Sequence, residues 1–230
     1  MNEPKILLFR GSPRSDIEEV EKWNDKLPCD TLLVRYVNEF MAYEYARSFF
    51  LNHKEYDYLA IATDDIVVTP DNIIQLQNDL DDFKFPVISG MMNVDEVDWE
   101  DQWGNLNICY ELATKDRKVR FYNWVKANAL PLEDIFRVMF AGFGLTAIRR
   151  DIVEEEGFNF ASDGVFRGTG IENGASLDLV FAWYCLEKGI PQYCDQRIHM
   201  HHLRNHGRMK VGEREREVIY NGKSIRFGDV

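Results

Sequence analysis

Short apolar runs alternate with amphipathic stretches over the first part of the chain, and this alternation constrains the fold more than any other feature. The runs lie at residues 5–9, 31–37, 58–62 and 85–90. Between them, Met41, Tyr45 and Phe49 recur with the spacing of one helix face. Strands that alternate with helices predict an α/β fold with a mostly parallel, twisted sheet flanked by helices.

A residue that can cap a helix stands at the start of each of three predicted helices. These helices begin at Asn38, at Thr69, which is followed by Pro70, and at Ser176. Proline suits the first helical position, because the N–H that it lacks would have no partner within the helix. Gly189 is expected to end the third helix, since glycine adopts the left-handed conformation found after helix ends.

Two segments fall outside this regular pattern. Residues 93–134 carry an acidic run and then a basic one, which indicates a solvated excursion or an added hairpin, with a flap on the acceptor side of a site as the alternative. Residues 204–230 are highly charged, and the Tyr220–Lys223 stretch contains the Asn-Gly signal of a type I′ hairpin. We therefore expect one domain over residues 1–203 and a short extension over residues 204–230.

The charge balance excludes several classes of partner. The chain has 230 residues and a net charge of −12, whereas proteins that bind nucleic acid or anionic membranes use basic surfaces. No apolar run approaches the roughly 20 residues that span a bilayer, and the start of the chain lacks the pattern of a signal peptide. Its four cysteines are scattered without a CxxC spacing. We expect a cytoplasmic protein with no integral membrane segment.

The candidate strand at residues 58–62 ends next to two adjacent carboxylates, Asp64 and Asp65. Carboxyl ends of strands are where open α/β sheets bind ligands, and carboxylate oxygens suit Mg²⁺ or Mn²⁺. Three alternatives remain open: a pair of solvated turn carboxylates, an aspartate that interacts with the N-terminus of the following helix, and the phosphoacceptor of a receiver domain. The receiver is disfavoured, because its first strand is followed by acids and this one is followed by Arg10 and Gly11.

Three other groups of side chains have the chemistry of a site. Four of the five histidines fall within residues 199–206, where a transition metal or an ordinary polar edge strand are both consistent with the pattern. Asp178 lies in the first turn of a predicted helix and can act as a general base or complement the helix dipole. Arg10, Ser12 and Arg14 follow the first strand and can bind an anionic ligand or be exposed turn residues.

These segments together resemble the glycosyltransferases of the GT-A fold, most closely those of the family 2 type. The resemblance rests on the Arg10 loop, Asp64-Asp65, the stretch from Gly144 to Arg149-Arg150, Phe158, Ser176-Leu177-Asp178 and residues 198–201, which occur in the family's order. It covers roughly residues 5–202. Two positions depart from the family's pattern: Thr63 stands where the first acid of an Asp-x-Asp motif is usual, and Leu177 stands where a Glu usually precedes the catalytic Asp.

The resemblance implies a metal-dependent enzyme that transfers a sugar from a nucleotide-sugar donor to a carbohydrate, lipid-linked or protein acceptor. It assigns Mn²⁺ or Mg²⁺ to Asp65 and His201, with Asp64 contacting the metal or the donor. It assigns the catalytic base of an inverting reaction to Asp178. The donor nucleotide would contact the end of the first strand and its loop, at Phe9, Arg10, Gly11, Ser12 and Arg14, and Gly142, Phe143 and Gly144 would lie on the acceptor side.

Two other functions fit the same fold. A sugar-phosphate nucleotidyltransferase shares the sheet type, but its first loop is usually richer in glycine and basic residues than Gly11-Ser12-Pro13-Arg14. A non-catalytic protein that binds a nucleotide or a carbohydrate would account for the incomplete aspartate motif at Thr63.

Overall fold

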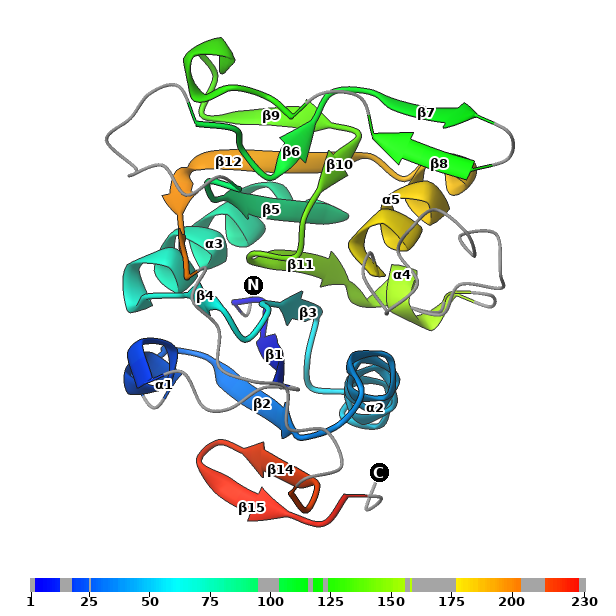
Figure 1. Cartoon of the computed structure of the whole chain (residues 1–230). Coiled ribbons are helices and arrows are strands. Elements are labelled where there is room, and N and C mark those ends of the chain that lie inside the picture. Colours follow the sequence, from blue (N-terminus) through cyan, green and yellow to red (C-terminus); the bar gives the residue numbers. More distant parts are fainter. Residues whose placement is uncertain are drawn as a thin grey trace.

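The computed structural model describes residues 3–12, 18–24, 26–94, 104–115, 118–121, 124–155, 158, 177–203 and 214–227. Within these residues a nine-stranded sheet forms the centre of the molecule (Figure 1). Its spatial order is β15 (Lys223–Ile225), β14 (Glu217–Tyr220), β2 (Asp30–Arg35), β1 (Ile6–Ser12), β3 (Tyr58–Ile61), β11 (Thr146–Arg149), β5 (Val87–Met91), β12 (Gln192–His199) and β9 (Ile135–Val138).

Three strand pairs lie outside the main sheet. They are β4 (Ile66–Val67) with β13 (His201–His202), β6 (Ile108–Cys109) with β10 (Phe140–Ala141), and β7 (Leu112–Lys115) with β8 (Lys118–Phe121). The β7–β8 pair is antiparallel, which confirms the added hairpin expected in residues 93–134. Leu106 and Ile108 are fully buried against the main sheet, so part of this segment is core rather than a solvated excursion.

Helices cover both faces of the main sheet. On one face lie α2 (Glu39–Asn52), α4 (Arg150–Glu154) and α5 (Leu177–Lys188), and on the other lie α1 (Glu18–Asn24) and α3 (Pro70–Phe83), while a 3₁₀ turn spans Ala127–Ala129 (Figure 1). Alternate β1 residues supply the two cores: Leu7 and Phe9 pack toward α2, and Ile6 and Leu8 pack toward α3. None of the helices in the described residues has the length and apolar character needed to cross a membrane.

The sheet is mixed, which corrects the expectation of a mostly parallel one. Strands β1, β2 and β3 are parallel, as are β5 and β12, but β11 is antiparallel to both β3 and β5. The first residue of β11, Thr146, lies opposite Ile61 and Ser89, near the carboxyl ends of β3 and β5. The chain therefore enters β11 from that edge, and the strand runs back toward the amino ends of its neighbours.

The local helix signals operate as expected. The Asn38 side chain accepts a hydrogen bond from Phe40 N, and Thr69 forms a reciprocal capping box with Asn72. Gly189, with φ of +67°, follows α5. Ser176, the expected cap of α5, lies outside the described residues.

The expected C-terminal hairpin forms as well. Asn221 and Gly222 both have positive φ, as a type I′ turn requires. The first strand, β14, pairs with β2 and buries Val218 completely. The hairpin is therefore the edge of the main sheet rather than an appendage beside it.

Candidate active site

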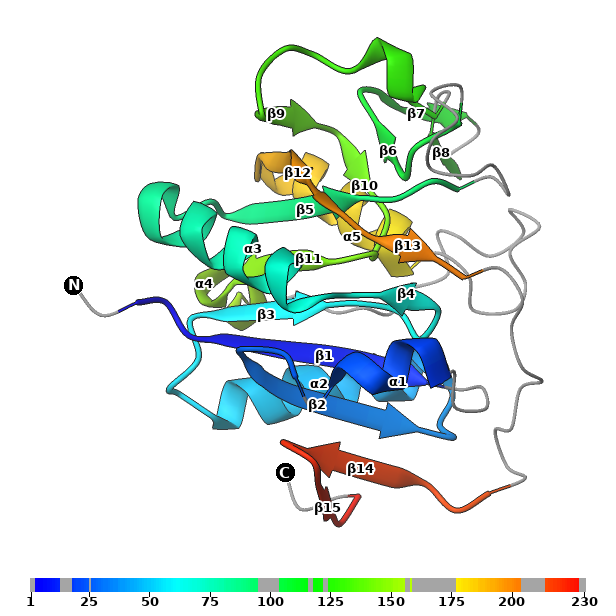
Figure 2. The same cartoon turned by 90° about the vertical axis from the view of Figure 1, so that its left-hand side faces the viewer.

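The loop between β3 and β4 holds the two aspartates at the carboxyl ends of β1 and β3. Asp64 and Asp65 are 6% and 7% exposed. The Thr63 hydroxyl donates a hydrogen bond of 2.7 Å to Asp65 Oδ1. Thr63, which stands where the resembled family usually has an acid, therefore orients Asp65. Figure 2 shows β4 and β13 beside each other at this edge of the sheet.

Arg10 lies behind this loop and is almost completely buried. Its Nη1 donates to the carbonyl oxygens of Ile66, at 2.9 Å, and Thr63, at 3.4 Å. Nε and Nη2 make no hydrogen bond within the described residues. Burial lowers the Arg10 pKa to about 10, against the nearby charges of Cys29, Asp64 and Asp65, which raise it. The side chain is thus a buried cation near the carboxylates of Asp64 and Asp65. Its Nε and Nη2 groups remain available to donate hydrogen bonds.

His202, and not His201, faces the aspartates. In the antiparallel β13–β4 pair, His202 lies opposite Ile66 and His201 lies opposite Val67. His202 Nε2 is 3.4 Å from Asp65 Oδ2, and Leu203 N donates to Asp65 O at 2.8 Å. His201 is exposed. Its assignment as a metal ligand remains a prediction, but the geometry favours its neighbour.

The side chains at this edge of the sheet could coordinate a cation together with oxygen atoms of a bound substrate. Asp65 supplies a carboxylate and His202 an imidazole, a combination that suits Mn²⁺. Within the described residues, no three His, Cys, Asp or Glu side chains gather closely enough to hold a metal ion by themselves. Any ion bound here therefore needs further oxygen ligands, such as those of a diphosphate and water.

Asp178 begins α5 on the other side of the strand ends. Its carboxylate accepts hydrogen bonds from the backbone N–H groups of Leu179 and Phe143. Burial raises the Asp178 pKa to about 6, and the backbone donors lower it by a smaller amount. A carboxylate with a pKa near neutrality can take up a proton during a reaction.

The turn at Gly142, Phe143 and Gly144 joins the two acidic groups. The Phe143 N–H donates to Asp178, while its carbonyl oxygen accepts from Thr63 N at 3.2 Å. A Cβ on Gly144 would lie 2.9 Å from the terminal methyl group of Met200, so a larger residue here would displace the end of that side chain. The turn therefore has a structural role that the sequence pattern did not indicate.

Tyr43 of α2 lies under the same turn. Its ring stacks on Phe143 at 5.8 Å and packs edge-on against Phe9 at 5.0 Å. Burial raises the Tyr43 pKa well above its ordinary value, and the charges of Glu39, Asp178, Asp64 and Asp65 add to this, in that order. The charges of Asp178, Asp64 and Asp65 therefore all act on this one buried hydroxyl.

The other residues assigned to the donor loop are placed as follows. Phe9 is fully buried, and a Cβ on Gly11 would lie 3.2 Å from its ring. Ser12 is buried and its carbonyl accepts from Tyr36 N at 2.8 Å. Arg14 lies outside the described residues.

Sequence reasoning missed His202 and Tyr43, and it missed Asn107, which hydrogen-bonds Gly142. The alternation of side chains along a strand was the one available signal for His202. Nothing local distinguishes Tyr43 from other core aromatics, or Asn107 from other asparagines in its segment.

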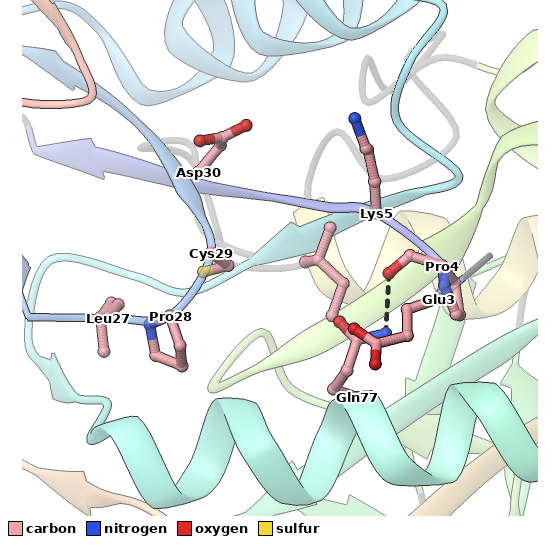
Figure 3. A pocket seen from close by; sticks show the side chains of 9 residues that line it. Glu3, Pro4, Lys5, Leu27, Pro28, Cys29, Asp30 and Gln77 are labelled. Carbon is pink, nitrogen blue, oxygen red and sulfur yellow. Dashed lines mark hydrogen bonds between the residues drawn. The ribbon is translucent and has the colours of Figure 1, made fainter.

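A wide groove lies at the opposite end of the strands (Figure 3). It has a volume of about 850 Å³ and is lined by residues that include Lys5, Cys29, Asp30 and Gln77. Gln77 Nε2 donates to Pro4 O at 2.7 Å across one side of it. The groove contains none of the candidate residues described above.

Comparison with known proteins supports the fold. No protein-family model matches the chain. No curated protein matches it either. Among solved structures, 25 chains match. One is the crystal structure of A197 from STIV, with a TM-score of 0.58, 17% sequence identity, and coverage of 87% of this chain and 86% of that chain. At this level of identity the likeness shows a shared mixed α/β fold.

Proposed function

We propose that this protein is a glycosyltransferase of the GT-A fold, which transfers a sugar from a nucleotide-sugar to an acceptor hydroxyl. One observation carries the proposal. A carboxylate–imidazole pair, Asp65 and His202, and a separate carboxylate with a raised pKa, Asp178, are linked through the backbone of one residue, Phe143. Transfer of a glycosyl group from a diphosphate needs these two functions side by side.

The first function is to hold the donor. Asp65 and His202 fit a shared Mn²⁺ or Mg²⁺ ion, and Asp64, in the same loop, would contact that ion or the donor ribose. When bound, such an ion neutralises the charge that develops on the departing diphosphate. Arg10 adds a fixed positive charge behind the loop, where its buried position strengthens its interaction with an anion.

The second function is to activate the acceptor. Asp178 accepts the proton of the acceptor hydroxyl as its oxygen bonds to the anomeric carbon. The bond between that carbon and the diphosphate breaks, and its electron pair leaves with the diphosphate. Attack from the face opposite the leaving group inverts the configuration at the anomeric carbon.

A thermal-shift screen of nucleotide-sugars with and without Mn²⁺ tests donor binding. Stabilisation by one nucleotide-sugar that requires Mn²⁺ is expected, because a ligand that binds only the folded state raises its stability. Asp65→Asn should lose this shift, while Asp71→Asn, an exposed acid in the first turn of α3, should retain it. The absence of any nucleotide-dependent shift in the wild type would contradict the proposal.

The products then separate the possible functions. A glycosyltransferase releases nucleoside diphosphate from the nucleotide-sugar, slowly to water or rapidly to a suitable acceptor. Release of pyrophosphate from a nucleoside triphosphate and a sugar phosphate would instead identify a nucleotidyltransferase. Metal-dependent binding with no release under either condition would indicate a binding protein.

A further inference from the structure

Asn107 makes an unusual set of contacts near the carboxyl end of β5. It is 1% exposed, and its N, O, Oδ1 and Nδ2 atoms each take part in a hydrogen bond. Its N donates to Met92 O at 3.0 Å, and its Oδ1 accepts from Met92 N at 2.9 Å. Its O accepts from Gly142 N at 2.8 Å, and its Nδ2 donates to Gly142 O at 3.2 Å. One asparagine thus ties the end of β5 to the turn before β11.

The turn that Asn107 holds, Gly142–Gly144, is tight. Gly144 N donates to Gly142 O at 2.7 Å, so the carbonyl that Asn107 binds also closes the turn. A Cβ on Gly142 would lie 3.4 Å from Asp178 Oδ2 and 3.6 Å from Asn107 Cβ. The turn is therefore held between Asn107 on one side and Asp178 on the other.

Fixing Gly142 fixes the direction of the next peptide group. The Phe143 N–H meets Asp178, and the Phe143 carbonyl meets Thr63 N in the loop that carries Asp64 and Asp65. The Gly142 carbonyl and the Phe143 N–H belong to the same peptide group, so if the turn were released this peptide could rotate and the hydrogen bond to Asp178 would weaken. An amide side chain that satisfies both polar groups of one residue is well suited to prevent this.

We propose that Asn107 is a positioning residue, which holds the Gly142–Gly144 turn so that the Phe143 N–H is aimed at the Asp178 carboxylate. Its importance for transfer rests on the proposed function, but the positioning itself does not. Asn107 contacts neither substrate nor metal in this arrangement. It acts through the turn, on the group that receives the acceptor's proton.

The test is a ¹³C-detected NMR titration of the Asp178 carboxyl group, which needs no substrate. In the wild type the midpoint is expected at about pH 6. In Asn107→Ala the Asp178 pKa should rise by about one unit, because the ionised carboxylate loses a backbone donor. Among the described residues, Tyr43 is the other ionisable group that faces Asp178, and its pKa is raised well above its ordinary value.

Asn72→Ala is the matched control. Asn72 is also a buried asparagine, 8% exposed, and its Nδ2 donates to His199 O at 2.9 Å. This variant should lose stability through its cap while leaving the Asp178 pKa unchanged. A folded Asn107→Ala protein with an unchanged Asp178 pKa and an unchanged Phe143 amide resonance would overturn the proposal.

Two further readouts keep the proposal testable if Asn107→Ala does not fold. In the wild type, the Phe143 amide resonance should titrate with the same midpoint as Asp178, and a flat Phe143 resonance would contradict the link. The milder variant Asn107→Ser should show the same rise in the Asp178 pKa. If transfer is measured, kcat should fall about tenfold or more with little change in the donor KM, whereas failure to bind any nucleotide-sugar would refute only the proposed function.

Discussion

At the scale of single residues, the site depends on which way neighbouring side chains point. His201 and His202 are adjacent, yet one is exposed and the other lies against Asp65, because successive residues of a strand face opposite sides. The sequence located the histidine segment but not the member that faces the aspartates. That choice depends on the register between β13 and β4, which no local pattern specifies.

The two histidines make a matched pair of variants. His202→Ala should weaken Mn²⁺-dependent binding of the nucleotide by about tenfold or more, since a ligand of the ion is lost. His201→Ala should leave it within twofold. Isothermal titration with UDP and with GDP, each with Mn²⁺ present, measures the effect. The reverse order of effects would support His201 as the ligand.

Asp178 is expected to set the acidic limit of activity. Since burial raises its pKa to about 6, the base is protonated below that pH and kcat/KM should fall as pH decreases through about 6. Asp178→Asn should reduce turnover by about 10²–10⁴-fold while donor binding is retained. Steady-state kinetics across pH 5–8 check this, and wild-type activity that stays flat through pH 6 would exclude Asp178 as the base.

Asp178 should also give folding stability a pH dependence opposite to that of activity: stability falls as the pH rises through about 6, whereas activity increases. A pKa raised in the folded state contributes stability that is present below the unfolded pKa of 3.8 and is lost as pH rises through about 6. At pH 8 the native protein therefore carries a partly buried charge at a cost, and Asp178→Asn should unfold at a higher temperature than the wild type. Calorimetry of both proteins at pH 8 measures this difference.

At the scale of elements, local signals predicted helix starts and turns well. The Thr69–Pro70 start of α3, the Asn38 cap of α2 and the Asn221–Gly222 turn are all present. Each depends on contacts within a few residues, so the sequence contains the whole interaction. The partner of the hairpin is different, because β14 pairs with β2, and that pairing joins residues far apart in the chain.

The hairpin turn provides a test at this scale. Gly222 has φ of +73°, so Gly222→Ala should destabilise the protein by about 1 kcal/mol, since a Cβ strains this conformation. Lys223→Ala, at an exposed neighbour, should stay within about 0.5 kcal/mol of the wild type. Urea unfolding of both variants gives the comparison. Equal stability of the two would show that the turn is not strained by a Cβ.

At the scale of the whole molecule, a buried acidic pair links α3 to β12. Asp79 and Asp195 are 3% and 0% exposed, and both accept hydrogen bonds from Arg197. Burial, together with the Asp195 carboxylate, raises the Asp79 pKa to about 7. The pKa of Asp195 is lowered, chiefly by Arg197 against the effect of burial. The pair therefore retains one proton at mildly acidic pH.

This pair predicts a loss of stability at alkaline pH. The contribution of Asp79 is fully present below its unfolded pKa and is lost as pH rises through about 7. Asp79→Asn should remove that dependence and stabilise the protein at pH 8 by roughly 1–3 kcal/mol. Denaturant unfolding at pH 5.5 and pH 8 checks the sign. An equal pH dependence in wild type and variant would contradict this assignment.

The sequence by itself determined the elements whose signals are local: apolar runs for strands, caps for helices, the Asn-Gly turn, and the chemistry available at Asp64, Asp65, Asp178 and Arg10. The tertiary structure decided the direction of β11, the burial of Leu106 and Ile108, and the meeting of His202 with Asp65. It also decided that the backbone of one residue, Phe143, joins the two acidic groups. These features depend on contacts between residues far apart in the chain, whose geometry is set only when the sheet assembles.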